Sequence, residues 1–146
     1  MKSNRGFSLL ELLIVVAIIL IIATIAIPSL LRSRQAAQES AAVSQIRTVN
    51  TAEVTYLSSA AGNYGDIPNL ITAGLLDNRF TGSVSGYKFD VQASGTEYTA
   101  SATPTSTNAG RFGYWSTPDA VVRYQSVTST VCNPCFPTGQ SGNPVQ

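Results

Sequence analysis

An apolar stretch near the N-terminus constrains this chain more than any other feature of its sequence. Residues 12–23 contain no polar side chain, and residues 9–31 are apolar except for Glu11, Thr24, Pro28 and Ser29. A helix over residues 7–31 would be about 37 Å long at about 1.5 Å per residue. The hydrocarbon core of a bilayer is about 30 Å thick, so this segment is long enough to span it. We therefore predict a transmembrane helix over residues 7–31.

The charges on either side of this stretch indicate its orientation in the membrane. Lys2 and Arg5 precede it, together with the free amino terminus, and favour a cytoplasmic N-terminus. Arg32 and Arg34 follow it and argue weakly for the opposite orientation. An ordinary secretory signal peptide has a shorter apolar core, which a small-residue cleavage site follows. A simple membrane anchor fits the length but leaves Glu11 unexplained, since a lone carboxylate costs about 2–3 kcal/mol even on the mildest insertion scale.

The start of the apolar stretch resembles the processing site of type IV prepilins. The resemblance rests on residues 5–13, which read RGFSLLELL. It implies that residues 1–6 are a leader, and that a prepilin peptidase cuts between Gly6 and Phe7. The new Phe7 terminus would then be N-methylated, and the mature chain would have 140 residues (146 minus 6). Glu11 and Pro28 also match the pattern of this family.

Glu11 and Pro28 are the candidate assembly residues. Cleavage after Gly6 would leave an ammonium group on Phe7, one helical turn before Glu11. In a filament the carboxylate can instead face the Phe7 ammonium of a neighbouring subunit, where each charge left unpaired would be costly. We expect Glu11 to set the axial register of such a filament. Pro28 removes one backbone hydrogen bond, so the helix is expected either to kink there or, as the resemblance implies, to melt there during assembly.

The apolar helix is expected to continue as an amphipathic half over residues 32–58. Residues 29–58 contain neither glycine nor proline. At about 100° per residue, one side of this half is apolar and the opposite side carries hydroxyl groups. The apolar side consists of Val43, Ile46, Val49, Val54, Tyr56 and Leu57, and the opposite side of Ser44, Thr48, Thr51, Thr55 and Ser58. Gly62 and Asn63 are expected to end the helix, and its apolar side to pack on a sheet.

The remaining residues, 59–146, predict a small globular head. Residues 66–74 indicate a short helix, with Pro68 in its first turn and Gly74 beyond its end. Alternating apolar residues and turn residues predict strands over residues 87–92, 98–102, 111–116 and 121–125. Consecutive hairpins imply an antiparallel sheet. The expected fold class is therefore α+β, a long N-terminal helix packed on a small antiparallel sheet, which is similar to pilin and pseudopilin heads.

The two cysteines, Cys132 and Cys135, lie close together near the C-terminus. A zinc site would need two further ligands, and the chain has no other cysteine and no histidine to supply them. A redox-active dithiol would lack its usual strand–helix context. Outside the inner membrane a disulfide is the expected state. Many pilins close a C-terminal loop in this way, although usually a much longer one, and closing a short loop removes little chain entropy.

The composition argues against most catalytic and ligand-binding functions. The chain has no histidine, which is the commonest general base and metal ligand. Its net charge of +1 gives no basic patch for a nucleic acid. The loop carboxylates are scattered along the chain, and none belongs to a calcium-binding loop. We therefore expect no enzymatic activity, no cofactor and no metal site.

The resemblance implies a structural subunit of a type IV pilus that serves adhesion, motility or DNA uptake. The alternative is a pseudopilin of a type II secretion system, because the leaders of the two classes are indistinguishable. The cysteine pair and the lack of a calcium loop favour the pilus. A membrane-anchored thiol oxidoreductase, the third hypothesis, would leave Glu11 unexplained.

Several partners and a location follow from the resemblance. The partners are further copies of the chain, a prepilin peptidase and methylase, an inner-membrane assembly platform with its cytoplasmic ATPase, and minor pilins. The precursor would lie in the bacterial inner membrane, with a cytoplasmic N-terminus and a periplasmic head. It would then enter an extracellular pilus.

Overall fold

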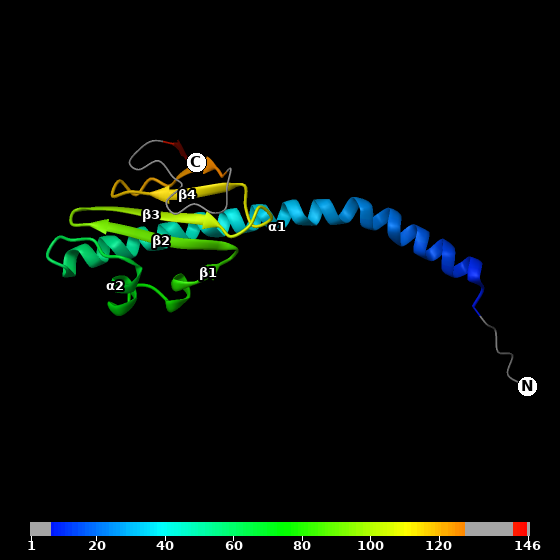
Figure 1. The fold of residues 1–146 in the computed structure, drawn as a ribbon, viewed down its shortest axis with the longest axis horizontal. Coiled ribbons are helices and arrows are strands. Elements are labelled where there is room, and N and C mark those ends of the chain that lie inside the picture. Colours follow the sequence, from blue (N-terminus) through cyan, green and yellow to red (C-terminus); the bar gives the residue numbers. More distant parts are fainter. Residues whose placement is uncertain (1–6, 128–141, 146) are drawn as a thin grey trace, which may run out of the picture. The chain divides into compact units, whose positions relative to one another are not determined.

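The computed structural model of the chain describes residues 7–127 and 142–145 (Figure 1). Gly6 and the rest of the expected leader lie outside the described residues, as do Cys132 and Cys135. The chain forms two compact units, Met1–Arg34 and Gln35–Gln146. Each unit contains part of one long helix, α1 (Leu9–Ser59).

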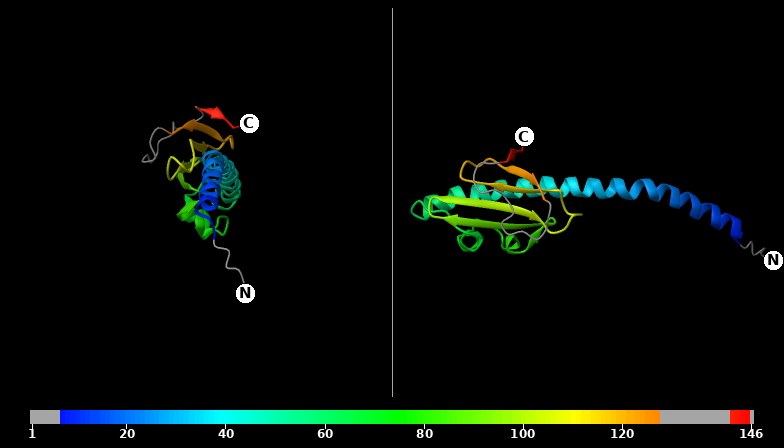
Figure 2. Two further views of the ribbon diagram at one scale, coloured as in Figure 1. Left: turned by 90° about the vertical axis from the view of Figure 1, so that its right-hand side faces the viewer. Right: turned by 45° about the horizontal axis from the view of Figure 1, so that its top comes forward.

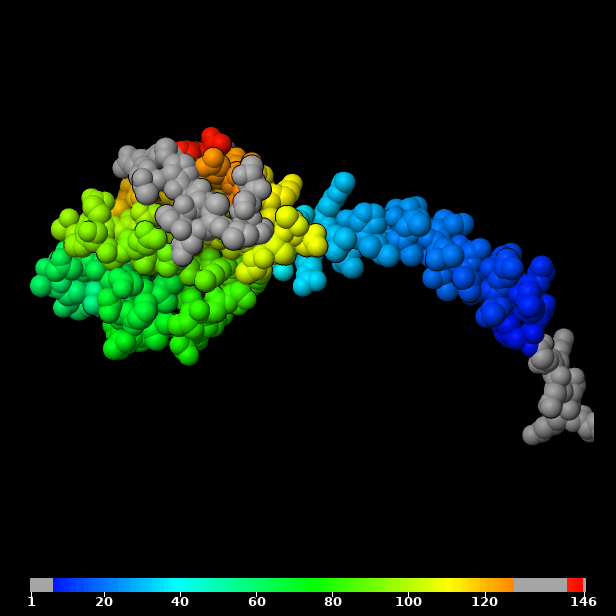
Figure 3. All heavy atoms as spheres, in the orientation of Figure 1, coloured from blue at the N-terminus to red at the C-terminus, as the bar shows by residue number. Residues whose placement is uncertain are grey.

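The described part of the first unit consists almost entirely of the N-terminal part of α1. The helix passes through Pro28 without interruption. Its apolar side chains are exposed in the isolated chain, from Leu9 at 80% to Leu31 at 52% (Figure 3). Among the described residues, α1 is the one helix that is long and apolar enough to cross a membrane. A surface this apolar needs lipid or other protein around it.

The second unit packs the C-terminal part of α1 on one face of an antiparallel sheet (Figure 2). Within the described residues the sheet has six strands, which follow one another in sequence order from β1 to β6. Two short helical elements, α2 (Ile67–Thr72) and η1 (Asn78–Thr81), lie between α1 and the first strand. The strands are β1 (Ser83–Val84), β2 (Tyr87–Ser94), β3 (Glu97–Pro104), β4 (Phe112–Ser116), β5 (Arg123–Ser126) and β6 (Asn143–Pro144). The predicted α+β fold class is confirmed.

The β2–β3 hairpin agrees best with the pattern of the sequence. Its two strands pair from Tyr87 opposite Pro104 to Ser94 opposite Glu97, so both are longer than predicted. The predicted strand over residues 121–125 begins instead at Arg123, because a tight loop with Ala120 at a φ of 58° precedes it. The edge strands β1 and β6 were not predicted, since two residues are too few to show an alternating pattern.

The core lies between α1 and the sheet. Ile46 and Val49, on the predicted apolar side of α1, are fully buried, and every predicted hydroxyl position is exposed. The prediction for Val54 is wrong, because its side chain is 57% exposed. Val54 follows the buried Glu53 by one residue and therefore points about 100° away from it around the helix. The main core residues are Ala42, Ile46, Val49, Leu70, Phe80, Tyr87, Phe89, Val91, Tyr98, Ala100 and Ala102.

Buried polar residues of α1 tie the helix to the rest of the head. The carboxylate of Glu39 accepts hydrogen bonds from the backbone N–H of Arg111 at 2.8 Å and from its Nε and Nη2 at 3.2 and 3.0 Å. Asn50 donates to Ser116 Oγ at 2.9 Å and accepts from the Tyr98 hydroxyl at 3.0 Å. These bonds offset the cost of burying polar groups and fix how α1 lies against β3 and β4.

Glu53 is the buried carboxyl whose environment is least favourable to charge. It is fully buried, and its Oε2 accepts a hydrogen bond from the backbone N–H of Gly65 at 3.1 Å. Its Oε1 has no hydrogen-bond partner among the described residues. Burial raises the pKa of this carboxyl, the Gly65 bond opposes that rise, and the neighbouring Asp66 carboxylate adds to it.

We expect Glu53→Gln to stabilise the head at pH 7 and to remove part of its pH dependence. An amide oxygen can still accept the Gly65 bond, while the buried charge disappears. Because the folded-state pKa of Glu53 is raised above 4.5, the wild-type free energy of unfolding should fall as the pH rises from about 4.5 through that pKa. The glutamine variant lacks this fall, so its advantage should grow over the same pH range. Urea titrations of both chains in detergent micelles test this; an advantage that shrinks with rising pH would contradict it.

Candidate functional site

Phe7 and Ser8 lead into α1, and Glu11 in its first turn is the charged residue of the apolar stretch of the first unit. Ser8 lies immediately before the first residue of the helix, in the N-cap position. Its carbonyl accepts the first bond of the helix, from the N–H of Leu12 at 3.2 Å. The N–H of Ser8 donates to Glu11 Oε2 at 3.0 Å. This bond is one half of a capping box, in which a glutamate in the first turn satisfies the backbone N–H of the N-cap residue.

The capping box gives Glu11 a role that the sequence-based prediction missed. The pattern Ser-x-x-Glu before an apolar run was visible at Ser8 and Glu11 and could have identified it. The bond holds the carboxylate at the N-terminal end of α1, where the helix dipole favours negative charge. Its other oxygen, Oε1, makes no hydrogen bond within the described residues 7–127 and 142–145.

The apolar surroundings of Glu11 determine which groups its second oxygen, Oε1, can bind. The neighbouring side chains Leu9, Leu10, Leu12 and Leu13 are all exposed and apolar. In water such a carboxylate is simply solvated. If lipid or other helices covered this surface, the free oxygen would need a cation or a hydrogen-bond donor, because an unpaired charge is costly in an apolar medium. Glu11 Oε1 can therefore bind a cation on another molecule that packs against this apolar surface.

Pro28 lies inside α1, and the helix continues past it. Proline has no N–H to donate to the carbonyl of Thr24, four residues earlier, so one bond of the helix is missing. The hydroxyl of Thr24 donates to the carbonyl of Ile21 at 2.7 Å, a separate bond that does not satisfy the Thr24 carbonyl. Local melting at Pro28 during assembly stays a prediction.

The structure brings some predicted site residues together and leaves others outside the described part of the chain. Glu11 lies in the first turn of α1 and Pro28 further along the same helix, whereas Phe7 lies two residues before the helix begins. Gly6, Cys132 and Cys135 fall outside the described residues. Within the described ranges, no three His, Cys, Asp or Glu residues are close enough to hold a metal ion.

Comparison with known proteins adds two similarities. The family described as the prokaryotic N-terminal methylation motif matches residues 1–27. The chain is also 41% identical over 68 residues to the type IV major pilin protein PilA of Myxococcus xanthus (strain DK1622). That match covers 47% of this chain and 30% of the relative, so the chain spans less than a third of the protein it resembles.

Proposed function

We propose that this chain belongs to the type IV pilin superfamily and is a structural subunit of a type IV pilus, which its N-terminal motif and its similarity to a major pilin support. The observation that carries the proposal is the start of α1. There a single carboxylate, Glu11, lies within the methylation-motif match over residues 1–27, on a helix whose apolar side chains are exposed. A plain membrane anchor would explain the apolar surface but not the carboxylate, whereas a helical polymer can use both.

The proposed assembly site consists of Phe7 and Glu11. Cleavage after Gly6 frees the amino group of Phe7 and leaves the backbone N–H of Ser8 in place. Glu11 Oε2 can therefore keep its bond to Ser8 while Oε1 receives the ammonium group of a neighbouring Phe7. The pair contributes little net stability by itself, but a subunit placed out of register would leave both charges unpaired in an apolar contact. Register selection is thus the proposed role of Glu11.

The proposed partners would cleave the leader, methylate Phe7 and extract the helix from the membrane. A prepilin peptidase and methylase would remove residues 1–6 and methylate Phe7. An inner-membrane platform and a cytoplasmic ATPase would supply the work of extracting the apolar helix from lipid, and minor pilins would join the filament. The precursor is proposed to lie in the inner membrane and the assembled subunit in an extracellular pilus that serves adhesion, motility or DNA uptake.

Mass spectrometry of sheared surface filaments tests this function. We expect the filaments to contain the chain with an N-terminal peptide that begins at N-methylated Phe7 and lacks residues 1–6. Deleting the gene should remove the filaments and leave the secretion of exoproteins intact. Absence of the chain from sheared material, together with lost exoprotein secretion on deletion, would instead identify a pseudopilin of a type II secretion system.

A further inference from the structure

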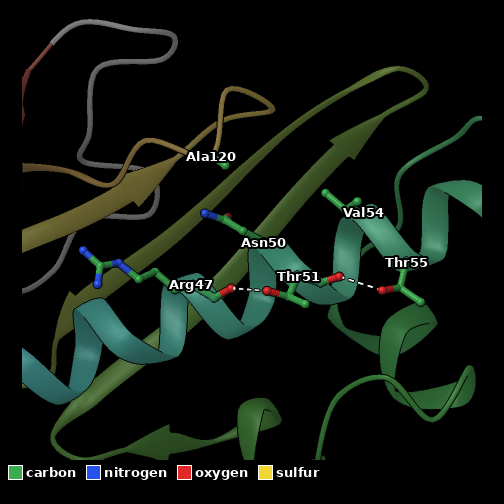
Figure 4. A pocket seen from close by; sticks show the side chains of 6 residues that line it. All are labelled: Arg47, Asn50, Thr51, Val54, Thr55 and Ala120. Carbon is green, nitrogen blue, oxygen red and sulfur yellow. Dashed lines mark hydrogen bonds between the residues drawn. The ribbon is translucent and has the colours of Figure 1, made fainter.

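A shallow groove of about 370 Å³ lies on the second unit, between α1 and the loop over residues 117–122 that joins β4 to β5. Figure 4 shows the side chains of α1 on one side of it and the loop with Ala120 on the other. The groove is lined by Arg47, Asn50, Thr51, Val54, Thr55 and Ala120. It lies on the part of α1 that carries the exposed Val54, the residue that departs from the predicted packing.

The loop side of the groove is rigidly braced. The carboxylate of Asp119 accepts hydrogen bonds from Thr117 Oγ1 and from the N–H of Val121, both at 3.0 Å. It also forms an ion pair with Arg123, at 2.6 Å from Nη2. This guanidinium lowers the pKa of Asp119, so the brace stays charged at neutral pH. The brace holds Ala120 at a φ of 58°, a conformation that residues with a Cβ atom rarely adopt.

On the helix side of the groove, the threonine hydroxyls already donate hydrogen bonds within α1. The hydroxyl of Thr51 donates to the carbonyl of Arg47 at 3.0 Å, and the hydroxyl of Thr55 donates to the carbonyl of Thr51 at 2.9 Å (Figure 4). Both donors are therefore satisfied within α1. Val54 is 57% exposed beside them, and Val121, at the loop, is 37% exposed. The groove is consequently an apolar surface held open to solvent at a conformational cost.

We propose that this groove receives the apolar N-terminal helix, residues 7–31, of a second copy of the chain. The inference rests on the proposed filament function. It adds a contact between the head of one copy, at α1 and the β4–β5 loop, and the N-terminal helix of another copy. The occupant follows from complementarity. Residues 7–31 present mostly exposed Leu, Ile and Val side chains that must be covered once they leave lipid. Beside Arg47 and Asn50, the groove offers valine, alanine and two threonines.

The charges at the groove agree with this occupant. Arg47 is the one charged residue among those that line it, and its guanidinium makes no ion pair within the described part of the chain. One cation is too few for a nucleic acid, which proteins bind through clustered basic residues. The alkyl part of an arginine can instead cover apolar surface while its charged end stays in water. Residues 12–31 of the occupant, which contain no charged side chain, can therefore lie in this groove without leaving a buried charge unpaired.

Photo-crosslinking in assembled filaments tests the contact. A photoreactive p-benzoylphenylalanine at Val54 should give a covalent dimer on irradiation, and mass spectrometry should place the second attachment within residues 7–31. The same amino acid at Lys88, an exposed position on β2, is the matched control and should not react with that segment. Attachment to head residues alone, or no more reaction from position 54 than from position 88, would overturn the inference. Wild-type chains that form no filaments would instead overturn the proposed function.

A second measurement does not depend on the photoreactive residue. Val54→Asp should lower filament yield at least about ten-fold, because it places a carboxylate in an apolar contact. The control Gln92→Asp adds the same charge at an exposed position of β2 and should assemble normally. Urea titration of both chains in detergent checks that each head is folded. Equal yields from two folded variants would contradict the proposed contact.

Discussion

Replacing Glu11 with alanine is expected to abolish filament assembly while leaving a chain that is processed and resident in the membrane. The substitution removes the acceptor for a neighbouring Phe7 ammonium, and that ammonium is then left unpaired among apolar helices. Breaking a buried pair in this way costs about 3–5 kcal/mol. At about 1.4 kcal/mol for each ten-fold change, the association constant per subunit should fall by on the order of a hundred-fold or more. Filament yield in sheared fractions, normalised to processed chain in membranes, measures the effect.

Two further variants separate the charge of Glu11 from its cap. Glu11→Gln keeps an oxygen that can accept the bond from the N–H of Ser8 but removes the charge. We expect it to assemble as poorly as Glu11→Ala. Glu97→Gln removes the same charge at an exposed position at the start of β3 and should still assemble. Normal filament yield from Glu11→Gln would show that capping alone explains this residue and would contradict its role in pairing with Phe7.

Gly142→Ala is expected to release the C-terminal strand and to expose Trp115, the single tryptophan of the chain. Gly142 has a φ of 117°, and a Cβ atom there would lie 2.4 and 2.5 Å from two carbons of the Trp115 ring. β6 follows directly and pairs with β5, with Arg123 opposite Pro144 and Tyr124 opposite Asn143. Backbone strain and overpacking together should cost about 2–4 kcal/mol. A red shift of the tryptophan emission and an earlier urea midpoint measure the change.

Gly82→Ala is the matched control for this experiment. A Cβ atom at Gly82 would have its nearest neighbour, the carbonyl oxygen of Arg79, at 3.8 Å, and its backbone does not require glycine. Its emission and urea midpoint should stay close to those of the wild type. If Gly142→Ala behaved in the same way, the close approach of the C-terminal segment to Trp115 would not matter for stability.

The sequence predicted those parts of the fold that carry a long periodic pattern. The helix through Ile46 and Val49 and the β2–β3 hairpin have the periods of a helix and a strand, and both are confirmed. Ion pairs between distant residues leave no such pattern. Glu39 and Arg111 are 72 residues apart, and only the fold shows that they meet. Val54 was misplaced because the buried face of α1 runs through the polar residues Asn50 and Glu53, which a search for apolar residues passes over.

The candidate site was predictable for a different reason. Glu11 is conspicuous because a charge inside an apolar stretch is costly and therefore needs an explanation. Its bond to Ser8 was also accessible from the local spacing, as a capping box. The groove beside Val54 was not accessible, because it depends on the bend at Ala120 and on the bracing of Asp119 by Arg123. Such features arise only when distant segments pack together.

Electron cryomicroscopy of the assembled filament tests the central claim most directly, because it locates Phe7 and Glu11 of neighbouring subunits in one map. We predict that residues 7–31 form the filament interior and that a carboxylate oxygen of each Glu11 lies within about 4 Å of the amino nitrogen of a neighbouring Phe7, the distance of an ion pair. A filament in which Glu11 faces solvent, or in which residues 7–31 lie outside the contacts between subunits, would contradict this account.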